Sequence, residues 1–221
     1  MSDVPDDKRY IQSVDRAMGI LTFVANSGSV RLGDVAEHMG LKTSTAFGLL
    51  QTLEHSGFVS RSQGGMEYCL GLSSLKLGLC FGSTTGLPQT IHTLLTEMVK
   101  ATGETAYFEM KIGERYYYYD VVLSKNPLKV VADSDQFIDL PRQSAVAQVF
   151  DDPTGQIAYA KDLEGVDVGL NCFAAPFRTA GSVVGCVALS GPANRFTEEK
   201  VDRAFGSFQS IMRRLSLEKY L

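Results

Sequence analysis

The chain has 221 residues and a mass of 24.1 kDa, with 44% hydrophobic residues, 21% charged residues and a formal net charge of −4. This composition excludes a disordered chain, and the length allows one or two domains. No apolar run reaches 18 residues, and the first residues are acidic and polar, so we expect no membrane span, no secretory signal and a cytoplasmic protein. The acidic balance gives no global sign of nucleic-acid binding, for which a basic excess is the usual first indication.

Three amphipathic helices are predicted in the first 60 residues. The first is capped by Ser13 and carries an apolar stripe from Val14 through Met18 to Val24. The second and third helices repeat the i, i+3, i+4, i+7 stripe from Leu32 to Met39 and from Ala46 to Leu53, and a glycine stops each of them. Two short helices joined by a tight turn that contains glycine predict a helix-turn-helix unit.

A β-hairpin is predicted next, from two strand-like runs, Phe58–Arg61 and Met66–Leu70, around a pair of glycines. A helix-turn-helix followed by a hairpin is a winged helix, which would end near residue 70. Residues 72–103 are then predicted to be helical. Ser73 or Ser74 could cap a first segment, and Pro88 starts a second one.

The pattern changes to strands after residue 103. Runs rich in Tyr, Val and Phe predict antiparallel strands at 104–111, 115–122 and 128–133, and a further hairpin is predicted from 172–178 and 182–190. Four consecutive tyrosines, 116–119, would alternate between the two faces of their strand. A final helix begins after Thr197 and has a wide apolar face from Val201 to Leu215. We expect a mixed sheet with helices on one face, an α+β sensor-like domain.

Enzymatic chemistry is not indicated. The chain has no nucleophile-elbow, zinc-protease, Walker or Rossmann pattern, and its three histidines all fall on predicted helices of the first half. The four cysteines, at 69, 80, 172 and 186, lack CxxC spacing, so we expect free thiols and neither a metal site nor a cofactor. The rival interpretation is a cysteine-based redox sensor or small-molecule sensor, which would need a thiolate of low pKa.

Short motifs in a fixed order support a family resemblance. They are Ser13–Ala17, Asp34–Glu37, Gly40–Leu41, Ser44–Thr45, Tyr68–Leu72, Gly103–Thr105, Cys172 with Ala174–Pro176, and Leu189–Pro192 with Arg195. Each motif alone is weak, but the ordered set is specific. From about residue 11 to residue 218 the chain resembles the IclR family of bacterial transcription regulators.

The resemblance implies an α+β protein with an N-terminal winged helix-turn-helix and a C-terminal GAF-like mixed α/β effector domain, joined by a linker helix. The expected divisions are a disordered tail (1–10), the DNA-binding domain (11–71), the linker helix (72–86) and the effector-binding domain (87–221). It also implies the partners: a double-stranded DNA operator, a small organic or aromatic acid as effector, and further copies of the chain in a homodimer or homotetramer. Such proteins repress or activate catabolic operons.

The third helix would carry DNA recognition, because side chains opposite the core stripe of a helix in the major groove face the bases. The predicted DNA-binding residues are Arg16, Arg31, Lys42, Thr43, Ser44, Thr45, Phe47, Gln51, Arg61 and Gln63. The alternative is that this is only the solvated face of an amphipathic helix. The family usually has Pro-Lys-Ser-Thr and then His-Arg in this helix, whereas here Lys42 is shifted and Phe47-Gly48 replaces the pair. Residues 1–70 carry a net charge of −2, which predicts modest binding per monomer, and oligomerisation over two half-sites would compensate.

The resemblance places effector binding in the second domain. The predicted residues are Arg142, Gln143, Ser144, Ala145, Asp162, Cys172 and Ser190. The alternatives are a small buried hydrophobe for Cys172 and a solvated loop acid for Asp162. The family's Gly-Lys is absent, Ala188 replaces a serine, and the segment after Phe150 is shortened. The pocket is therefore either more open, for a larger or more apolar ligand, or degenerate, with regulation passing through assembly.

Overall fold

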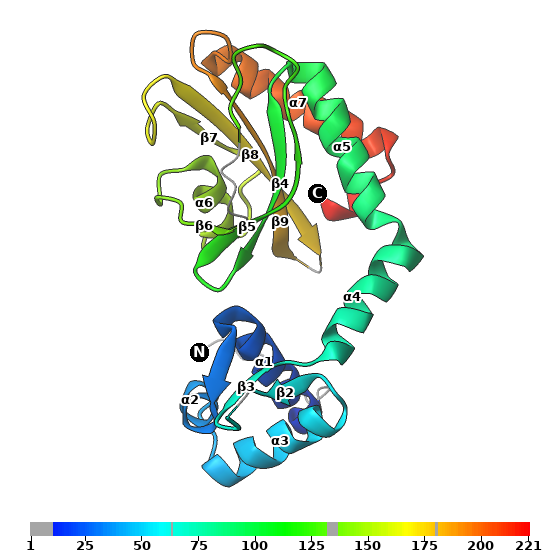
Figure 1. The fold of residues 1–221 in the computed structure, drawn as a ribbon. Coiled ribbons are helices and arrows are strands. Elements are labelled where there is room, and N and C mark those ends of the chain that lie inside the picture. Colours follow the sequence, from blue (N-terminus) through cyan, green and yellow to red (C-terminus); the bar gives the residue numbers. More distant parts are fainter. Residues whose placement is uncertain (1–10, 63, 132–136, 180) are drawn as a thin grey trace, which may run out of the picture. The chain divides into compact units, whose positions relative to one another are not determined.

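The computed structural model describes residues 11–62, 64–131, 137–179 and 181–221, which form two compact units, Met1–Thr85 and Gly86–Leu221 (Figure 1). The predicted tail at 1–10, Gln63 and the end of the predicted strand at 128–133 lie outside the described residues. Residues 128–131 are not in a strand. None of the helices in the described part of the chain has the length and apolar character to span a membrane.

The first unit is a winged helix. Its helices are α1 (Gln12–Ser27), α2 (Leu32–His38) and α3 (Thr43–His55), and its strands are β1 (Ser29–Arg31), β2 (Val59–Arg61) and β3 (Glu67–Leu70). The strands form an antiparallel sheet in the order β1-β3-β2. The helix-turn-helix and the hairpin are confirmed, but the three-residue strand β1 was not predicted. A strand this short has no readable alternation.

The boundaries and the buried face of α1 differ from the prediction. Ile11, not Ser13, is the N-cap, and no side chain caps the helix. Ile20 and Val24 are fully buried, whereas Val14 and Met18 are more than half exposed. The predicted stripe is confirmed in part: Val24 lies in the core of this unit, whereas Val14 and Met18 lie on a face that this unit does not cover.

A close chain crossing joins the wing to α4 (Leu72–Thr85). A Cβ on Gly71 would lie 2.2 Å from the carbonyl oxygen of Gly57, so only glycine fits at position 71. The hydroxyls of Ser73 and Ser74 donate to the carbonyls of Ser56 and Phe58, at 2.9 and 3.1 Å. The two serines therefore attach the first turn of α4 to the wing. Beyond this contact α4 has no buried residue.

The second unit is built on a six-stranded sheet in the order β6-β5-β4-β9-β8-β7. The strands are β4 (Thr105–Ile112), β5 (Arg115–Val122), β6 (Phe137–Ile138), β7 (Ala160–Leu163), β8 (Leu170–Thr179) and β9 (Ser182–Pro192). Every pairing is antiparallel, so the predicted mixed sheet is wrong. Short loops between sequential strands, such as Gly113-Glu114, allow only antiparallel neighbours.

Helices cover both faces of this sheet, not one as predicted. Helices α5 (Leu87–Thr102) and α7 (Glu198–Arg214) pack on one face, and the 3₁₀ turn η1 (Glu218–Tyr220) adds to it. The short helix α6 (Ala145–Phe150) packs on the other face, which we call the α6 face (Figure 1). The four tyrosines of β5 alternate as predicted: Tyr116 and Tyr118 pack on the α6 face, while the ring of Tyr119 contacts Phe108 on the opposite face.

Candidate functional site

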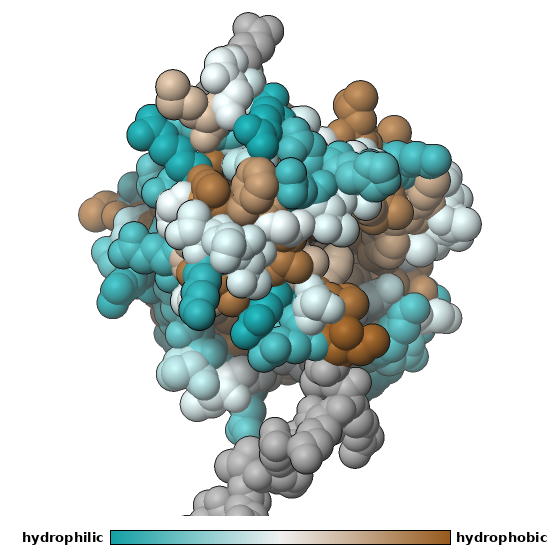
Figure 2. Space-filling view, turned by 90° about the horizontal axis from the view of Figure 1, so that it is seen from below, coloured by the Kyte–Doolittle hydropathy of each residue, from teal (hydrophilic) through white to brown (hydrophobic). Residues whose placement is uncertain are grey.

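Helix α3 presents a mainly polar face to solvent, interrupted by Phe47 and Gly48. Its buried side is formed by Ala46, Leu50 and Leu53, as predicted. The residues predicted to contact DNA from this segment are all exposed: Lys42, Thr43, Ser44, Thr45, Phe47 and Gln51. Nothing lies within 4 Å of a Cβ built on Gly48, so the helix backbone is open there. Figure 2 shows the molecule from below the view of Figure 1, the side on which α3 lies. Hydrophilic residues cover much of the surface seen there, with hydrophobic residues scattered among them.

Two of the predicted phosphate-binding arginines are paired with carboxylates. The Arg31 guanidinium lies 3.4 Å from Glu67, and the Arg61 guanidinium lies 3.3 Å from Glu54 and over the ring of Tyr68. Arg16 is half-buried, and Arg16 and Lys42 make no ion pair within the part of the chain that the structure describes. Carboxylates beside arginines reduce the positive field that a phosphate would meet.

Three of the predicted effector residues form one row on the α6 face. Asp162 of β7 is paired with Cys172 of β8, which is paired with Ser190 of β9. The Cys172 Sγ and Ser190 Oγ atoms are 3.3 Å apart. Asp162 is 6% exposed and its Oδ1 accepts a hydrogen bond from the Gly165 amide, so the alternative of a solvated loop acid is wrong.

The other four predicted residues surround the start of α6. Ser144 is its N-cap and accepts a hydrogen bond from the Ala147 amide, and Ala145 is buried. Arg142 and Gln143 are exposed. Arg142 lines an open hollow of about 750 Å³ at this edge of the α6 face. Neither Arg142 nor Gln143 makes a hydrogen bond or ion pair to the row of Asp162, Cys172 and Ser190.

The shortened segment after Phe150 folds around one carboxylate. Asp152 accepts hydrogen bonds from the amides of Thr154, Gln156 and Ile157. These hydrogen bonds lower the pKa of Asp152 to about 2, and the bond from the Ile157 amide has the largest effect. The segment is therefore a compact turn beside α6, in place of the further helices expected in the family.

The protonation of Cys172 does not support a redox sensor. Burial raises the pKa of the Cys172 thiol to about 11, although the hydrogen bond with Ser190 opposes the shift. Burial also raises the pKa of Cys186. A reactive cysteine needs a thiolate near neutral pH. All four cysteines are free, as predicted.

Sequence reasoning missed Glu109, a buried carboxyl on β4. It is 4% exposed, and its Oε2 atom has no hydrogen-bond partner among the described residues. Burial raises its pKa to about 8. The sequence signal was weak: Glu109 is one of two charged residues, with Lys111, on the same side of a mainly apolar strand.

Known proteins resemble both units. A family model of the IclR helix-turn-helix domain matches residues 13–63. The regulator BhcR of Paracoccus denitrificans is 22% identical over 96% of this chain and 88% of its own length, and the glycerol operon regulatory protein of Streptomyces coelicolor is 26% identical over 86% and 89%. The solved structure of an IclR family transcriptional regulator from Brucella abortus has a TM-score of 0.61 at 16% identity, covering 98% of this chain and 95% of that one.

The chain is similar to IclR-family regulators, through the family model over its helix-turn-helix and through relatives that span both units. The predicted resemblance is thereby confirmed, and so is the α+β fold with an N-terminal helix-turn-helix. The relatives that it resembles are named as transcriptional regulators. Because the family model covers α3, the exposed face of this helix is the candidate DNA-binding surface.

Proposed function

We propose that this protein, which resembles IclR-family regulators, binds an operator sequence-specifically and that a small organic or aromatic acid modulates its affinity, so that it controls a catabolic operon. The observation that carries the proposal is the exposed polar face of α3 in a helix-turn-helix of this family. Gln51 is suited to a bidentate contact with adenine, and Phe47 to a thymine methyl group. Lys42, Thr43, Ser44 and Thr45, at the N-terminal end of α3, are suited to phosphate contacts, which position the helix.

Arg16, Arg31 and Arg61 would add further phosphate contacts once DNA competes with their carboxylate partners. Gln63, which lies outside the described residues, belongs to the same proposal. Because the first 70 residues carry a net charge of −2, one winged helix alone would bind weakly. Two half-sites bound by one dimer would supply the missing affinity through a high effective concentration.

Exposed apolar residues of the first unit support a homodimer. On α1, Ile11, Val14 and Met18 are 70%, 55% and 52% exposed and recur at helical spacing. On α4, five large apolar side chains are exposed: Leu72, Leu75, Leu77, Leu79 and Phe81. Contiguous exposed apolar residues of this kind mark an interface. Pairing of two copies over these helices would cover them, as the family resemblance implies.

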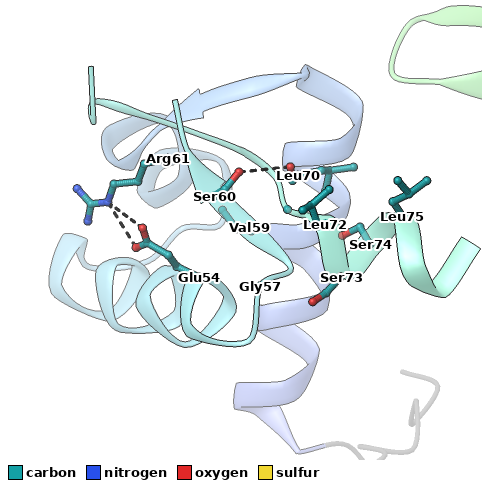
Figure 3. A pocket seen from close by; sticks show the side chains of 11 residues that line it. Glu54, Gly57, Val59, Ser60, Arg61, Leu70, Leu72, Ser73, Ser74 and Leu75 are labelled. Carbon is teal, nitrogen blue, oxygen red and sulfur yellow. Dashed lines mark hydrogen bonds and ion pairs between the residues drawn. The ribbon is translucent and has the colours of Figure 1, made fainter. Parts of the chain in front are cut away.

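The start of α4 adds a hollow to this apolar surface. Figure 3 shows that Leu70, Leu72 and Leu75 lie together on its side nearest α4, while the Arg61–Glu54 pair closes the other side. Its volume is about 880 Å³. Leu72 is 82% exposed, so the hollow could receive an apolar side chain of a second copy.

The effector would lie against the α6 face. The row of Asp162, Cys172 and Ser190 supplies polar groups in buried surroundings, and the start of α6 with Ser144 and Ala145 supplies backbone amides. Arg142 and Gln143 would contact the ligand at the rim. An effector that favours one arrangement of the oligomer would change its affinity for the operator. Bound operator would change the affinity for the effector by the same factor.

The test is a titration of the full chain onto its own upstream promoter DNA at several salt concentrations, against scrambled competitor. We expect specific binding with a log–log salt slope that reports several phosphate contacts. Gln51→Ala should reduce the preference for the promoter by about 10-fold or more. Gln89→Ala, an exposed glutamine of α5, is the matched control and should leave binding unchanged. Equal affinity for promoter and scrambled DNA at low salt would refute the proposed function.

A further inference from the structure

Glu109 lies at an irregular point in the middle of the sheet. It is paired with Cys186 of β9 and with Tyr118 of β5, and the register between β4 and β5 shifts between Phe108 and Glu109. A negative charge on Glu109 raises the pKa values of Tyr107, Cys172 and Cys186, so its carboxyl lies near all three side chains. The carboxyl is therefore on the α6 face, beside the row of Asp162, Cys172 and Ser190. Bulges of this kind often re-aim a side chain next to a binding site.

The surroundings of Glu109 leave its hydrogen-bonding capacity unused. The side chain is 4% exposed and Oε2 is without a hydrogen-bond partner in the described ranges. The nearest cation along the same side of β4, Lys111, pairs with Asp151 at 2.6 Å. An unpaired carboxyl oxygen in a buried site destabilises the fold, and a leucine or methionine would fill the same space without that cost. A buried polar atom without a protein partner calls for an explanation, and a bound ligand is one.

The polar groups beside Glu109 indicate which part of a ligand would reach it. The row consists of a carboxyl, a thiol and a hydroxyl, and within the described residues no cation pairs with it. A carboxylate placed there would be buried with no cation to balance its charge. A hydroxyl or ammonium group would instead find acceptors. A cationic donor, Arg142, lines the open hollow at the edge of the α6 face, where the acid group of the ligand would lie.

We propose that Glu109 determines effector specificity by accepting a hydrogen bond from a hydroxyl or ammonium group of the ligand. The effector is then an organic acid that carries a second group able to donate a hydrogen bond. This inference rests on the proposed effector site and adds a ligand class and a residue to it. An ammonium donor would ionise Glu109 on binding and release one proton to the buffer, whereas a hydroxyl donor would leave the proton on the carboxyl.

The test uses the full chain and acids that share a skeleton. Isothermal titration would compare propionate with lactate, 3-hydroxypropionate and alanine, and phenylacetate with mandelate and 4-hydroxyphenylacetate. We expect at least one donor-bearing acid to bind roughly tenfold more tightly than its unsubstituted parent, which is the effect of one hydrogen bond to a buried group. Repeating the titration in buffers of different ionisation enthalpy separates the two donors, because only the ammonium acid should release a proton.

Variants separate the role of Glu109 from that of the fold. Glu109→Leu should keep the fold, bind the parent acid as before, and lose the preference for the donor-bearing acid. Glu109→Gln retains an acceptor and should keep part of the preference. Glu218→Gln, an exposed glutamate in η1 on the opposite face of the sheet, should match the wild-type protein. A donor preference that survives in Glu109→Leu, or binding to wild-type protein with no donor preference, overturns the inference but leaves the effector site intact. Failure of every acid to bind the wild-type protein overturns the effector site itself.

Discussion

Glu109 makes the stability of the second unit depend on pH in a direction that can be worked out from the structure. Its pKa is about 8 in the folded chain and 4.5 in the unfolded reference, and burial is the cause. The folded state therefore binds the proton more tightly than the unfolded state. Stability from this group is fully present below pH 4.5 and is lost as the pH rises toward 8.

The size of the loss follows from the same two values. At 1.36 kcal/mol per pKa unit, raising the pH from 4.5 to 7 costs about 3 kcal/mol of unfolding free energy. Titratable groups that face Glu109 are Tyr107, Tyr118, Cys172 and Cys186, with Lys111 next along β4. Of these, Tyr107, Cys172 and Cys186 have raised pKa values, so they stay protonated in this interval. Glu109→Gln removes the carboxyl with little change of shape and should remove most of the pH-dependent loss.

Urea unfolding followed by circular dichroism would measure this difference, because the chain has no tryptophan to report by fluorescence. The unfolding free energy of Glu109→Gln, relative to that of the wild-type protein, should rise by about 2–4 kcal/mol between pH 5 and pH 7.5. Glu218→Gln is the control for the loss of one carboxylate and should follow the wild-type curve. Parallel curves for wild type and Glu109→Gln over this range would show that Glu109 is ionised and solvated, which would refute the reasoning.

Three further predictions concern other contacts. Glu54→Gln removes the carboxylate that pairs with Arg61 and should free this arginine to contact a phosphate. Operator binding should then tighten, and the log–log salt slope should increase in magnitude by up to about 1. An unchanged slope in filter-binding titrations would argue against contacts between the wing and DNA. Arg195→Met removes the two hydrogen bonds, 2.7 and 2.6 Å long, that hold buried Glu104, and should cost about 3–5 kcal/mol of stability in urea unfolding, whereas a cost below 1 kcal/mol would contradict the burial argument. Leu79→Asp, on the exposed side of α4, should shift the protein from dimer to monomer in sedimentation at micromolar concentration without loss of helix content, and an unaltered dimer would exclude α4 from the interface.

Local patterns predicted those elements whose buried face is set within their own unit. The stripe of α3, the glycine stops and the tyrosine alternation in β5 are all as expected, because each side chain meets the core of the same domain. Helix α1 shows where this reasoning fails. Val14 and Met18 have the same spacing as core residues but remain exposed in a single chain. An apolar residue required for an interface and one required for a core give the same sequence signal.

The candidate sites show a second limit of the sequence. The motifs of the family located Asp162, Cys172 and Ser190 as separate positions, and only strand pairing reveals that they form one row. Arg142 and Gln143 were predicted from the same loop as Ser144, yet they are exposed while Ser144 is buried. Glu109 could not be ranked from sequence, because a glutamate on a strand is usually solvated. Its significance depends on burial and on the missing partner, which are both tertiary properties.

The charge of the winged helix bears on how an effector bound to the second unit would control operator binding by the first. Because Arg31 and Arg61 are paired with carboxylates and the first 70 residues are net acidic, phosphate neutralisation by one winged helix is weak. In the proposed dimer, weak half-site binding would make operator occupancy depend on both half-sites being engaged at once, and so on the spacing that the dimer sets. An effector then needs only a small difference in affinity between two dimer arrangements, on the order of 1–3 kcal/mol, to change occupancy by about 5- to 150-fold. A strongly basic winged helix would hold DNA from a single half-site and would lose this sensitivity, so the acidic balance that argued against DNA binding in the sequence is consistent with a ligand-controlled regulator.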